Sequence, residues 1–231
     1  MLKLEGVDIR QGAFSLAASF TVEAGRRVAV IGPSGAGKST ILGALGGFIP
    51  LVAGRIYWND AEISKLRPGV RPVSMLFQDN NLFPHLTVYQ NVGLGVRPNL
   101  KLTPYEREQA QDAIRRVGLG GMAERRPAEL SGGQQSRASL ARILLQKQPL
   151  VLLDEPFAAL GPALRQEMLD LVRELVDEIG ATLLMVTHAP EDVARIADDV
   201  IFVEGGQALA PAPAAELLKN PPPALRAYLG G

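Results

Sequence analysis

A glycine-rich stretch, GPSGAGKST at residues 32–40, has the residue types and spacing that bind a phosphate chain. It lies between an apolar strand-like run, RVAVIG, and an apolar helical pattern, STILGALGG, which is the context that the nucleotide-binding pattern G-x-x-x-x-G-K-[ST] requires. Its glycines let backbone amides turn inward and form an anion nest with the helix N-terminus. An ordinary glycine-rich turn is the alternative. The predicted nucleotide-binding residues here are Gly32, Pro33, Ser34, Gly35, Ala36, Gly37, Lys38, Ser39 and Thr40.

Two carboxylates follow the apolar residues of LVLLDEP and are expected at the end of a neighbouring strand. Asp154 is suited to hold Mg²⁺, usually through water, with the Ser39 hydroxyl as a direct ligand. Glu155 would polarise the attacking water as a general base. Alone, an Asp-Glu pair after a strand would be a solvent-exposed turn. Beside the phosphate loop, where Lys38 reaches the β- and γ-phosphates, the pair predicts nucleotide hydrolysis.

A second anion nest is predicted in the segment ELSGGQQSRASLARIL, where Ser131 and the following glycine amides lie at a helix N-terminus. Two more polar residues follow apolar runs, Gln78 after VSMLF and His188 after TLLMVT. A histidine at a strand end is more often an ordinary surface residue, so His188 depends on the other motifs for its assignment. The chain therefore has two cradles for one kind of ligand.

The elements that must position these residues alternate between strands and helices. A helix is predicted over residues 103–117, where Thr103 and Glu106 form a capping box, and another over residues 162–179. This alternation predicts an α/β sheet core. The absence of a convincing strand from about 87 to 146 predicts a helical lobe inserted between two core strands. The strand-like runs are LKLEGVDI, FSLAASFTV, RIYWN, RVAVIG, VSMLF, LVLLD, TLLMVTH and VIFVE.

Composition argues against several classes of protein. At 231 residues with 47% apolar side chains, the chain is expected to form a single domain over residues 1–231. Lys plus Arg and Asp plus Glu both number 24, so no excess of positive charge favours a nucleic acid partner. The absence of cysteine excludes disulfides and thiolate metal sites. No signal-peptide pattern and no run of about 18 apolar residues appears, so we expect a chain that does not itself span a membrane.

In their order along the chain, these motifs resemble the ATP-binding subunits of ABC transporters, and the resemblance covers essentially the whole sequence. Leu130 to Gln134 reads LSGGQ, the family signature, Gln78 corresponds to the Q-loop glutamine, and His188 to the switch histidine. The implied fold is an α/β P-loop NTPase ABC ATPase core with an N-terminal antiparallel β subdomain and an inserted α-helical subdomain. The implied boundaries are 1–86 and 147–231 for the core and about 87–146 for the helical subdomain.

The resemblance also implies a head-to-tail homodimer with two ATP molecules sandwiched at its interface. Lys38 and Ser39 of one chain, with Ser131 and Gly133 of the other, would clamp each triphosphate. ATP would close the dimer and hydrolysis would release it. The implied catalytic residues are Glu155, His188 and Gln78, the Mg²⁺ ligands are Ser39, Gln78 and Asp154, and the ATP-binding residues also include Gln78, Ser131, Gly132, Gly133 and Gln134.

The segment after Gln78, DNNLFPHLTVYQNV, is similar to the family's importer version of the groove that receives a helix of the membrane permease. Leu82 and Phe83 would then be apolar anchors of that interface. The alternative is that both side chains pack on their own domain. The resemblance places the subunit peripherally at the cytoplasmic face of the inner membrane, with a periplasmic solute-binding protein as an indirect partner.

Within the family, the whole chain is most similar to the ATPase subunits of importers for thiamine and its phosphates. Nothing in these residues recognises thiamine chemically, because the ATPase subunit does not contact the transported molecule. Import of another small solute, such as iron or an oxyanion, is the first alternative. A soluble ABC ATPase that acts outside transport is the second, although the chain lacks the coiled coils, zinc cysteines and basic arms of that class.

Two positions depart from the family pattern. After LLDEPFAAL most members have an aspartate, in the D-loop that crosses the dimer and links the two ATP sites, whereas this chain has Gly161. Communication between the two sites is therefore an open question. Near the N-terminus the family offers an aromatic residue to stack on adenine, but DIRQGAF provides only Arg10 or the later Phe14, and neither is assigned.

Overall fold

The computed structural model describes residues 1–79, 81–158, 160–223 and 225–226, and it contains a mixed β-sheet. The strands are β1 (Leu2–Gln11), β2 (Phe14–Val22), β3 (Arg27–Ile31), β4 (Ala53–Trp58), β5 (Ala61–Glu62), β6 (Val73–Leu76), β7 (Leu150–Asp154), β8 (Thr182–Val186), β9 (Asp199–Glu204), β10 (Gln207–Ala208) and β11 (Ala212–Pro213). Their order in the sheet is β5-β4-β1-β2-β10-β9-β3-β8-β7-β6, with β11 paired to β9.

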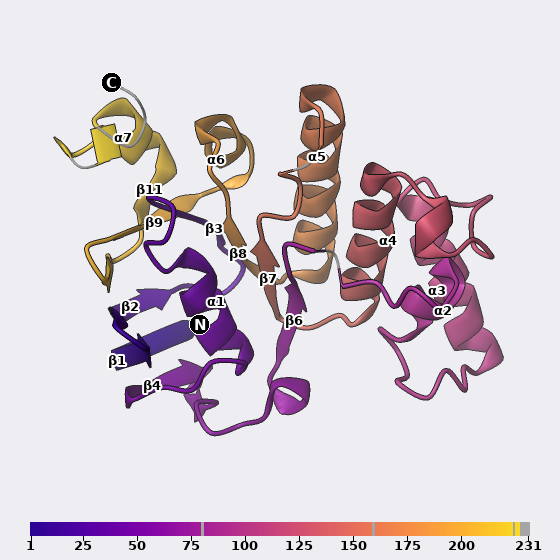
Figure 1. The fold of residues 1–231 in the computed structure, drawn as a ribbon, viewed down its shortest axis with the longest axis horizontal. Coiled ribbons are helices and arrows are strands. Elements are labelled where there is room, and N and C mark those ends of the chain that lie inside the picture. Colours follow the sequence, from indigo (N-terminus) through magenta and orange to yellow (C-terminus); the bar gives the residue numbers. More distant parts are fainter. Residues whose placement is uncertain (80, 159, 224, 227–231) are drawn as a thin grey trace.

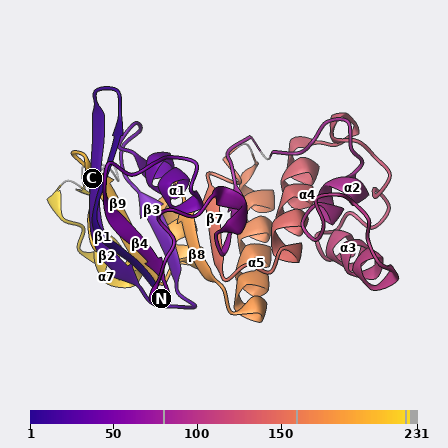
Figure 2. The same cartoon turned by 90° about the horizontal axis from the view of Figure 1, so that it is seen from below.

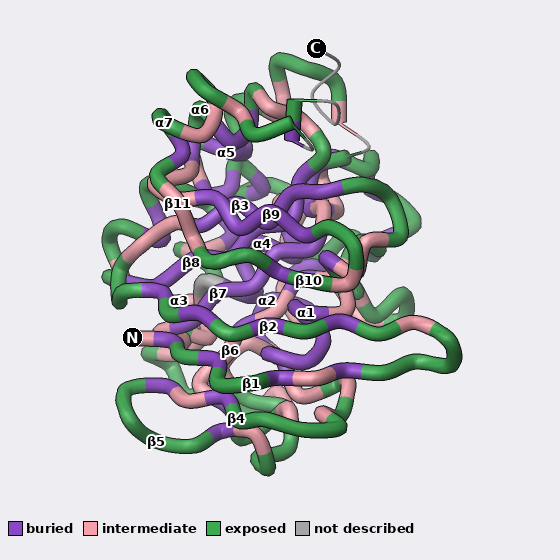
Figure 3. Tube along the Cα trace, turned by 90° about the vertical axis from the view of Figure 1, so that its left-hand side faces the viewer, coloured by how far each residue is buried: buried purple, intermediate pink, exposed green. Residues whose placement is uncertain are grey.

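The sheet has a parallel part and an antiparallel part. Strands β9, β3, β8, β7 and β6 pair in parallel, whereas the N-terminal strands β2, β1, β4 and β5 pair antiparallel. Every residue of β7 and β8 is buried, which explains their continuous apolar sequences, because parallel strands are covered on both faces. The antiparallel strand β2 instead alternates buried and exposed residues, as Figure 3 shows by colour. These features confirm the predicted strands and the α/β class.

The helices are α1 (Lys38–Gly46), α2 (Val88–Gly93), α3 (Pro104–Arg116), α4 (Gly132–Leu145), α5 (Pro162–Ile179), α6 (Pro190–Ile196) and α7 (Ala214–Lys219), with single 3₁₀ turns at Pro68–Val70 and Pro127–Glu129. Helices α2, α3 and α4 gather at one end of the molecule, away from the antiparallel strands β1, β2 and β4 (Figures 1 and 2). They share an apolar core that includes Val92, Ile114 and Leu130. Between β6 and β7 the described residues contain only helices and loops, as the sequence predicts.

Helix α1 is apolar on nearly all sides, and its position explains why. Ile41, Leu42 and Leu45 are buried in one cluster with residues from both the antiparallel and the parallel strands, among them Leu16 and Leu152. A helix that is hydrophobic all round is stable only when it is covered on all sides. The helix that follows the phosphate loop therefore packs against both the antiparallel and the parallel part of the sheet.

The two helices predicted from capping signals begin and end where expected. Thr103 accepts a hydrogen bond from the Glu106 amide, and the Glu106 carboxylate accepts one from the Thr103 amide, which completes the predicted capping box of α3. Helix α5 spans the predicted range and ends at Gly180, which has a left-handed conformation. Its apolar face, including Met168 and Val172, packs in a cluster with β7 and β8.

The start of α5 lacks a side-chain cap, and this leads to a stability prediction. Gly161 is the N-cap residue, with φ −64° and ψ 157°, and a Cβ added there meets no atom within 4 Å. The Gly161→Asp variant is expected to gain about 0.3–1 kcal/mol of unfolding free energy, because its carboxylate would accept a backbone amide and face the positive end of the helix. Urea unfolding with an unchanged m-value measures this gain. Gly161→Ala, which offers no acceptor, is the control, and an equal result for both variants would contradict the capping explanation.

Candidate functional site

The predicted chemical residues meet where parallel strands end. The phosphate loop follows β3, His188 follows β8, Asp154 and Glu155 lie at the end of β7, and Gln78 follows β6. The carboxyl ends of adjacent parallel strands form one edge, where such sheets bind ligands. An open cavity of about 430 Å³ lies there. It is lined by Gln11, Phe14, Ser34, Gly35, Gly37, Lys38, Ser39, Thr40, Gln78, Glu155 and His188.

One expectation about this edge was wrong. The motifs predicted that the carboxylates lie on a strand neighbouring the phosphate loop, but β8 lies between β3 and β7. The carboxylates still reach the loop because α1 begins directly after it and carries Ser39 across the edge of β8. The inserted strand contributes His188, so the site is built from more strands than the motif spacing alone suggests.

At two positions of the phosphate loop, neighbouring atoms leave no room for a side chain, so glycine is required. A Cβ added to Gly32, whose φ is 150°, would lie 2.1 Å from the backbone oxygen of Val203 on the adjacent strand β9. A Cβ added to Gly37, whose φ is 106°, would lie 2.6 Å from the Cζ atom of Phe14. These positions tolerate only glycine, since no side chain fits the space or the backbone angle. The loop is thus seated against β9 on one side and the β1–β2 turn on the other.

Lys38 is held in the centre of the phosphate loop. Its side chain is buried and its Nζ donates to the backbone oxygens of Gly32 at 2.8 Å and Pro33 at 2.9 Å. Burial lowers the pKa of Lys38, and the negative charges of Glu155 and Asp154 oppose that shift. A desolvated ammonium with only carbonyl partners is a strong donor for an incoming phosphate oxygen.

Ser39 and Asp154 bring two hard oxygen donors together. The Ser39 Oγ donates to the Asp154 Oδ1 at 2.9 Å, and Asp154 is buried. Within the described residues no group of three or more His, Cys, Asp or Glu side chains could hold a metal ion. A divalent cation at this pair would therefore take its remaining ligands from water and phosphate, which is how Mg²⁺ usually binds. The donor set present fits Mg²⁺ bound together with a nucleotide.

The pKa of Asp154 gives a prediction for folding stability. Burial raises this pKa above its ordinary value, while the hydrogen bond from Ser39 acts against the shift. Because the folded-state pKa is the higher one, the charged carboxylate costs stability at neutral pH, and the cost disappears as pH falls through the folded pKa and then the unfolded one. Asp154→Asn is thus expected to raise the unfolding temperature of the nucleotide-free protein at neutral pH, with a gain that shrinks toward acid. Thermal unfolding over that pH range measures it, and a gain independent of pH would contradict the assignment.

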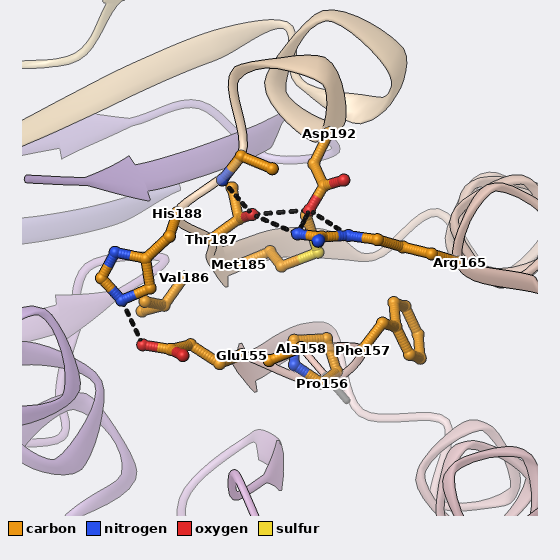
Figure 4. A pocket seen from close by; sticks show the side chains of 11 residues that line it. Glu155, Pro156, Phe157, Ala158, Arg165, Met185, Val186, Thr187, His188 and Asp192 are labelled. Carbon is orange, nitrogen blue, oxygen red and sulfur yellow. Dashed lines mark hydrogen bonds and ion pairs between the residues drawn. The ribbon is translucent and has the colours of Figure 1, made fainter. Parts of the chain in front are cut away.

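Glu155 and His188 form a second side-chain pair at the cavity (Figure 4). The His188 Nε2 lies 2.6 Å from the Glu155 Oε1, and the two side chains are 40% and 18% exposed. Glu155 has a φ of 46°, a left-handed conformation that costs a non-glycine residue on the order of 1–3 kcal/mol and is often found at functional sites. Its amide donates to the backbone oxygen of Val186 at 3.2 Å. The strained backbone turns the Glu155 carboxylate back toward the phosphate loop and His188.

The signature residues lie elsewhere. Ser131 Oγ accepts a hydrogen bond from the Gln134 amide, and Gln134 Oε1 accepts one from the Ser131 amide, so the two form a reciprocal cap on α4. Among the described residues that line the 430 Å³ cavity, none belongs to 131–134. Figures 1 and 2 place α4 and α1 on different sides of β6 and β7. Within a single chain, the phosphate loop and the signature segment 131–134 therefore lie apart.

The ends of β1 and β2 that flank their turn supply two cavity residues. Gln11 and Phe14 line the cavity, whereas Arg10 is ion-paired with Asp8 at 2.9 Å. The sequence offers Arg10 and Phe14 as residues that could stack on adenine. Phe14 lines the cavity, and Arg10 is not among its lining residues. Gln11 was missed, because only the hairpin pairing of β1 with β2 brings it over the phosphate loop and no local motif marks it.

The loop after Gln78 separates the two expected anchors. Leu82 packs against the core of α2, α3 and α4, while Phe83 is 47% exposed. The buried side chain of Asn91 holds this loop, since its Oδ1 accepts from the Phe83 amide at 2.8 Å and its Nδ2 donates to the backbone oxygens of Phe83, Leu86 and Thr87. Asn80, part of the same segment, lies outside the described residues.

Comparison with known proteins places this site in a family. The ABC transporter family matches residues 16–158, and the chain belongs to that family of ATPases. It is 63% identical over 230 residues, across the full length of both chains, to the thiamine import ATP-binding protein of Ruegeria sp. (strain TM1040). It is 50% identical over 207 residues, 90% of this chain and 96% of the relative, to the protein of that name from Haemophilus influenzae (strain 86-028NP).

A solved structure supports the same assignment. A dimeric ATP-binding cassette in a post-hydrolysis state with bound ADP and Pi has a TM-score of 0.81 and 28% identity, over 93% of this chain and 99% of that one. The predicted family and fold class, an α/β P-loop ATPase, are therefore confirmed.

Proposed function

We propose that this chain is the ATP-hydrolysing subunit of an ABC importer that takes up thiamine and thiamine phosphates across the inner membrane. The observation that carries the proposal is the convergence of Lys38, Ser39, Glu155 and His188 on one cavity, with Asp154 hydrogen-bonded to Ser39. A set that holds phosphate, metal ion and attacking water together is what phosphoryl transfer to water requires. The thiamine assignment rests on the full-length relatives named for thiamine import.

Each residue of the cavity has a distinct part in hydrolysis. Lys38 would exchange its carbonyl partners for β- and γ-phosphate oxygens, and Ser39 with Asp154 would hold Mg²⁺, which would supply positive charge beside the phosphates. Glu155 accepts a proton from the attacking water. His188 contacts the γ-phosphate and keeps the Glu155 carboxylate oriented through their 2.6 Å contact. Gln78, which follows β6, lines the same cavity and would sense Mg²⁺ and the water.

The signature segment completes the site from a second copy of the chain. Ser131, Gly132, Gly133 and Gln134 form an anion nest at the start of α4 that lies away from their own phosphate loop. A head-to-tail homodimer would bring this nest over the ATP held by the partner, and two-fold symmetry would repeat the contact reciprocally at the second ATP. The dimeric state of the related solved structure supports this arrangement.

We assign the membrane attachment to a permease partner at the cytoplasmic face. In the part of the chain that the structure describes, no helix is long and apolar enough to span a bilayer. Phe83 is exposed on a loop fixed by Asn91, which suits an apolar anchor for the permease, whereas Leu82 supports that loop from within. The periplasmic solute-binding protein delivers the solute to the permease and does not contact this chain.

A transport measurement tests the substrate. Cells that lack their own copy of this chain but keep the cognate permease and binding protein are supplied with it, and uptake of labelled thiamine, ferric iron and molybdate is measured. We expect thiamine uptake to be restored and the other two to be unaffected. Restored uptake of iron or the oxyanion without thiamine would contradict the substrate assignment and leave the importer assignment intact.

The docking assignment has its own test. Phe83→Ser is expected to reduce co-purification of the chain with its permease by about tenfold or more, because a central apolar anchor contributes roughly 2 kcal/mol or more to such interfaces. Tyr105→Ser, which alters a residue that is 69% exposed on α3, is the matched surface control. Unchanged co-purification of the Phe83 variant would show that the permease does not dock there.

A further inference from the structure

The loop that carries His188 lies over a cavity. Residues 187–189 connect β8 to α6, and beneath them is a cavity of about 270 Å³ (Figure 4). Glu155, Pro156, Phe157 and Ala158 line one side of it, and Thr187 with Asp192 lies on the other. Because a cavity provides no packing contacts, the position of the loop depends strongly on its polar anchors.

Those anchors meet at one buried carboxylate oxygen. The Asp192 Oδ2 accepts hydrogen bonds from the Thr187 Oγ1 at 2.5 Å and from the Arg165 Nε and Nη2 at 3.1 and 2.5 Å. The Thr187 Oγ1 also accepts from the Ala189 amide at 3.2 Å, so the residues on both sides of His188 are held. Asp192 and Thr187 are 5% and 3% exposed. Charge-assisted bonds to a buried carboxylate are short, directional and strong.

The third member of this network comes from a distant part of the chain. Arg165 lies in the first turn of α5, and its amide donates to the backbone oxygen of Gly161 at 2.9 Å. The guanidinium reaches from α5 to Asp192 on α6, and its Nη2 also lies 3.3 Å from the Thr187 Oγ1. The start of α5, directly after the segment where the family's D-loop aspartate is replaced by glycine, is therefore connected to the loop of His188.

We propose that Arg165 is a positioning residue for ATP hydrolysis: through Asp192 and Thr187 it fixes the loop that carries His188 and thereby holds His188 against Glu155. This inference rests on the proposed function. Arg165 is not among the residues that line the 430 Å³ cavity, so we expect it to act on the rate of the chemical step and not on nucleotide binding. A displacement of about 1 Å in a catalytic group costs up to about a hundredfold in rate.

A second α5–α6 ion pair provides the matched control. Arg195 on α6 donates through Nε and Nη2 to both carboxylate oxygens of Asp170 on α5, at 2.7 and 2.5 Å. This pair is exposed and does not include Thr187. If Arg165 simply joined α5 to α6, loss of either pair would have a similar effect on the protein.

The experiment measures kcat and KM for ATP in the purified complex with the permease. Arg165→Ala is expected to lower kcat by about ten- to a hundredfold, with KM unchanged within about twofold, because alignment and not binding is lost. Arg195→Ala is expected to stay within about twofold of the wild type in both quantities, since exposed ion pairs contribute little. Thr187→Val, which removes the hydroxyl but keeps the shape, should reproduce the Arg165 result, and Thr187→Ser should restore activity. The Thr187 pair also tests the proposal if Arg165→Ala does not fold.

Three outcomes would overturn the proposal. The first is a kcat for Arg165→Ala and Thr187→Val within about twofold of the wild type, and the second is an equal loss in Arg195→Ala. The third is a raised KM with unchanged kcat, which would make Arg165 a binding residue. A wild-type complex with no ATP hydrolysis would overturn the proposed function itself, whereas normal wild-type turnover with unaffected variants would overturn only this inference.

Discussion

Glu155→Gln is expected to lower ATP turnover by about 10² to 10⁴, which is the range that a general base contributes. The variant keeps the size of the side chain and a hydrogen-bonding oxygen, so the contact with His188 can persist. The glutamine side chain, at the end of β7, cannot accept a proton from the attacking water. ATP binding is expected to persist, because Lys38 and the phosphate loop are untouched and the site has one carboxylate fewer to repel the triphosphate.

Steady-state hydrolysis and binding of a fluorescent ATP analogue measure the two quantities separately. Glu191→Gln is the matched control, since Glu191 is an exposed glutamate on α6, close to His188 in the chain. Turnover of the Glu155 variant within about tenfold of the wild type would show that another group is the general base.

Lys38→Met is expected to raise the Kd for ATP by at least about ten- to a hundredfold. The methionine keeps most of the apolar stem in its buried position but supplies no charged donor, and a charge-assisted hydrogen bond contributes about 1.5–3 kcal/mol. The pKa of Lys38 is lowered by burial, which shows that the ammonium is poorly solvated in the free loop. A triphosphate would relieve that cost, so the loss on substitution exceeds that of a surface lysine.

Isothermal titration with ATP and Mg²⁺ measures the affinity. Lys65→Ala, at an exposed position before the Pro68–Val70 turn, is expected to bind ATP as the wild type does. Equal ATP affinity of the Lys38 variant and the wild type would remove Lys38 from the binding site. Loss of affinity in both variants would indicate that charge alone, without the loop geometry, accounts for binding.

Much of the fold could be predicted because its local signals are strong and agree with one another. The fully buried strands β7 and β8 have continuous apolar sequences, and Thr103 with Glu106 marks the start of α3 by two reciprocal hydrogen bonds. The phosphate loop was also recognisable, because its glycines are fixed by steric contacts such as that of Gly32 with β9. Capping boxes depend on residues that are neighbours in sequence, and buried strands are marked by runs of apolar residues. Both patterns are visible in a single sequence.

The rest depends on which distant segments meet. The insertion of β8 between β3 and β7 follows from strand order, and no motif spacing contains that information. Gln11 reaches the cavity only through a hairpin, and Leu82 is distinguished from Phe83 only by packing against the core of α2, α3 and α4. Arg165 and Asp192 are unremarkable charged residues on two helices until the fold places them on either side of Thr187.

The most direct test of the central claim is the ATP hydrolysis rate of the purified complex of this chain with its permease, reconstituted in lipid and exposed to the solute-binding protein with and without thiamine. We predict that the thiamine-loaded binding protein stimulates hydrolysis, that the unloaded protein does so weakly, and that Glu155→Gln abolishes the response. A hydrolysis rate that is the same with and without thiamine would contradict the account, because the site described here would then not be coupled to thiamine import.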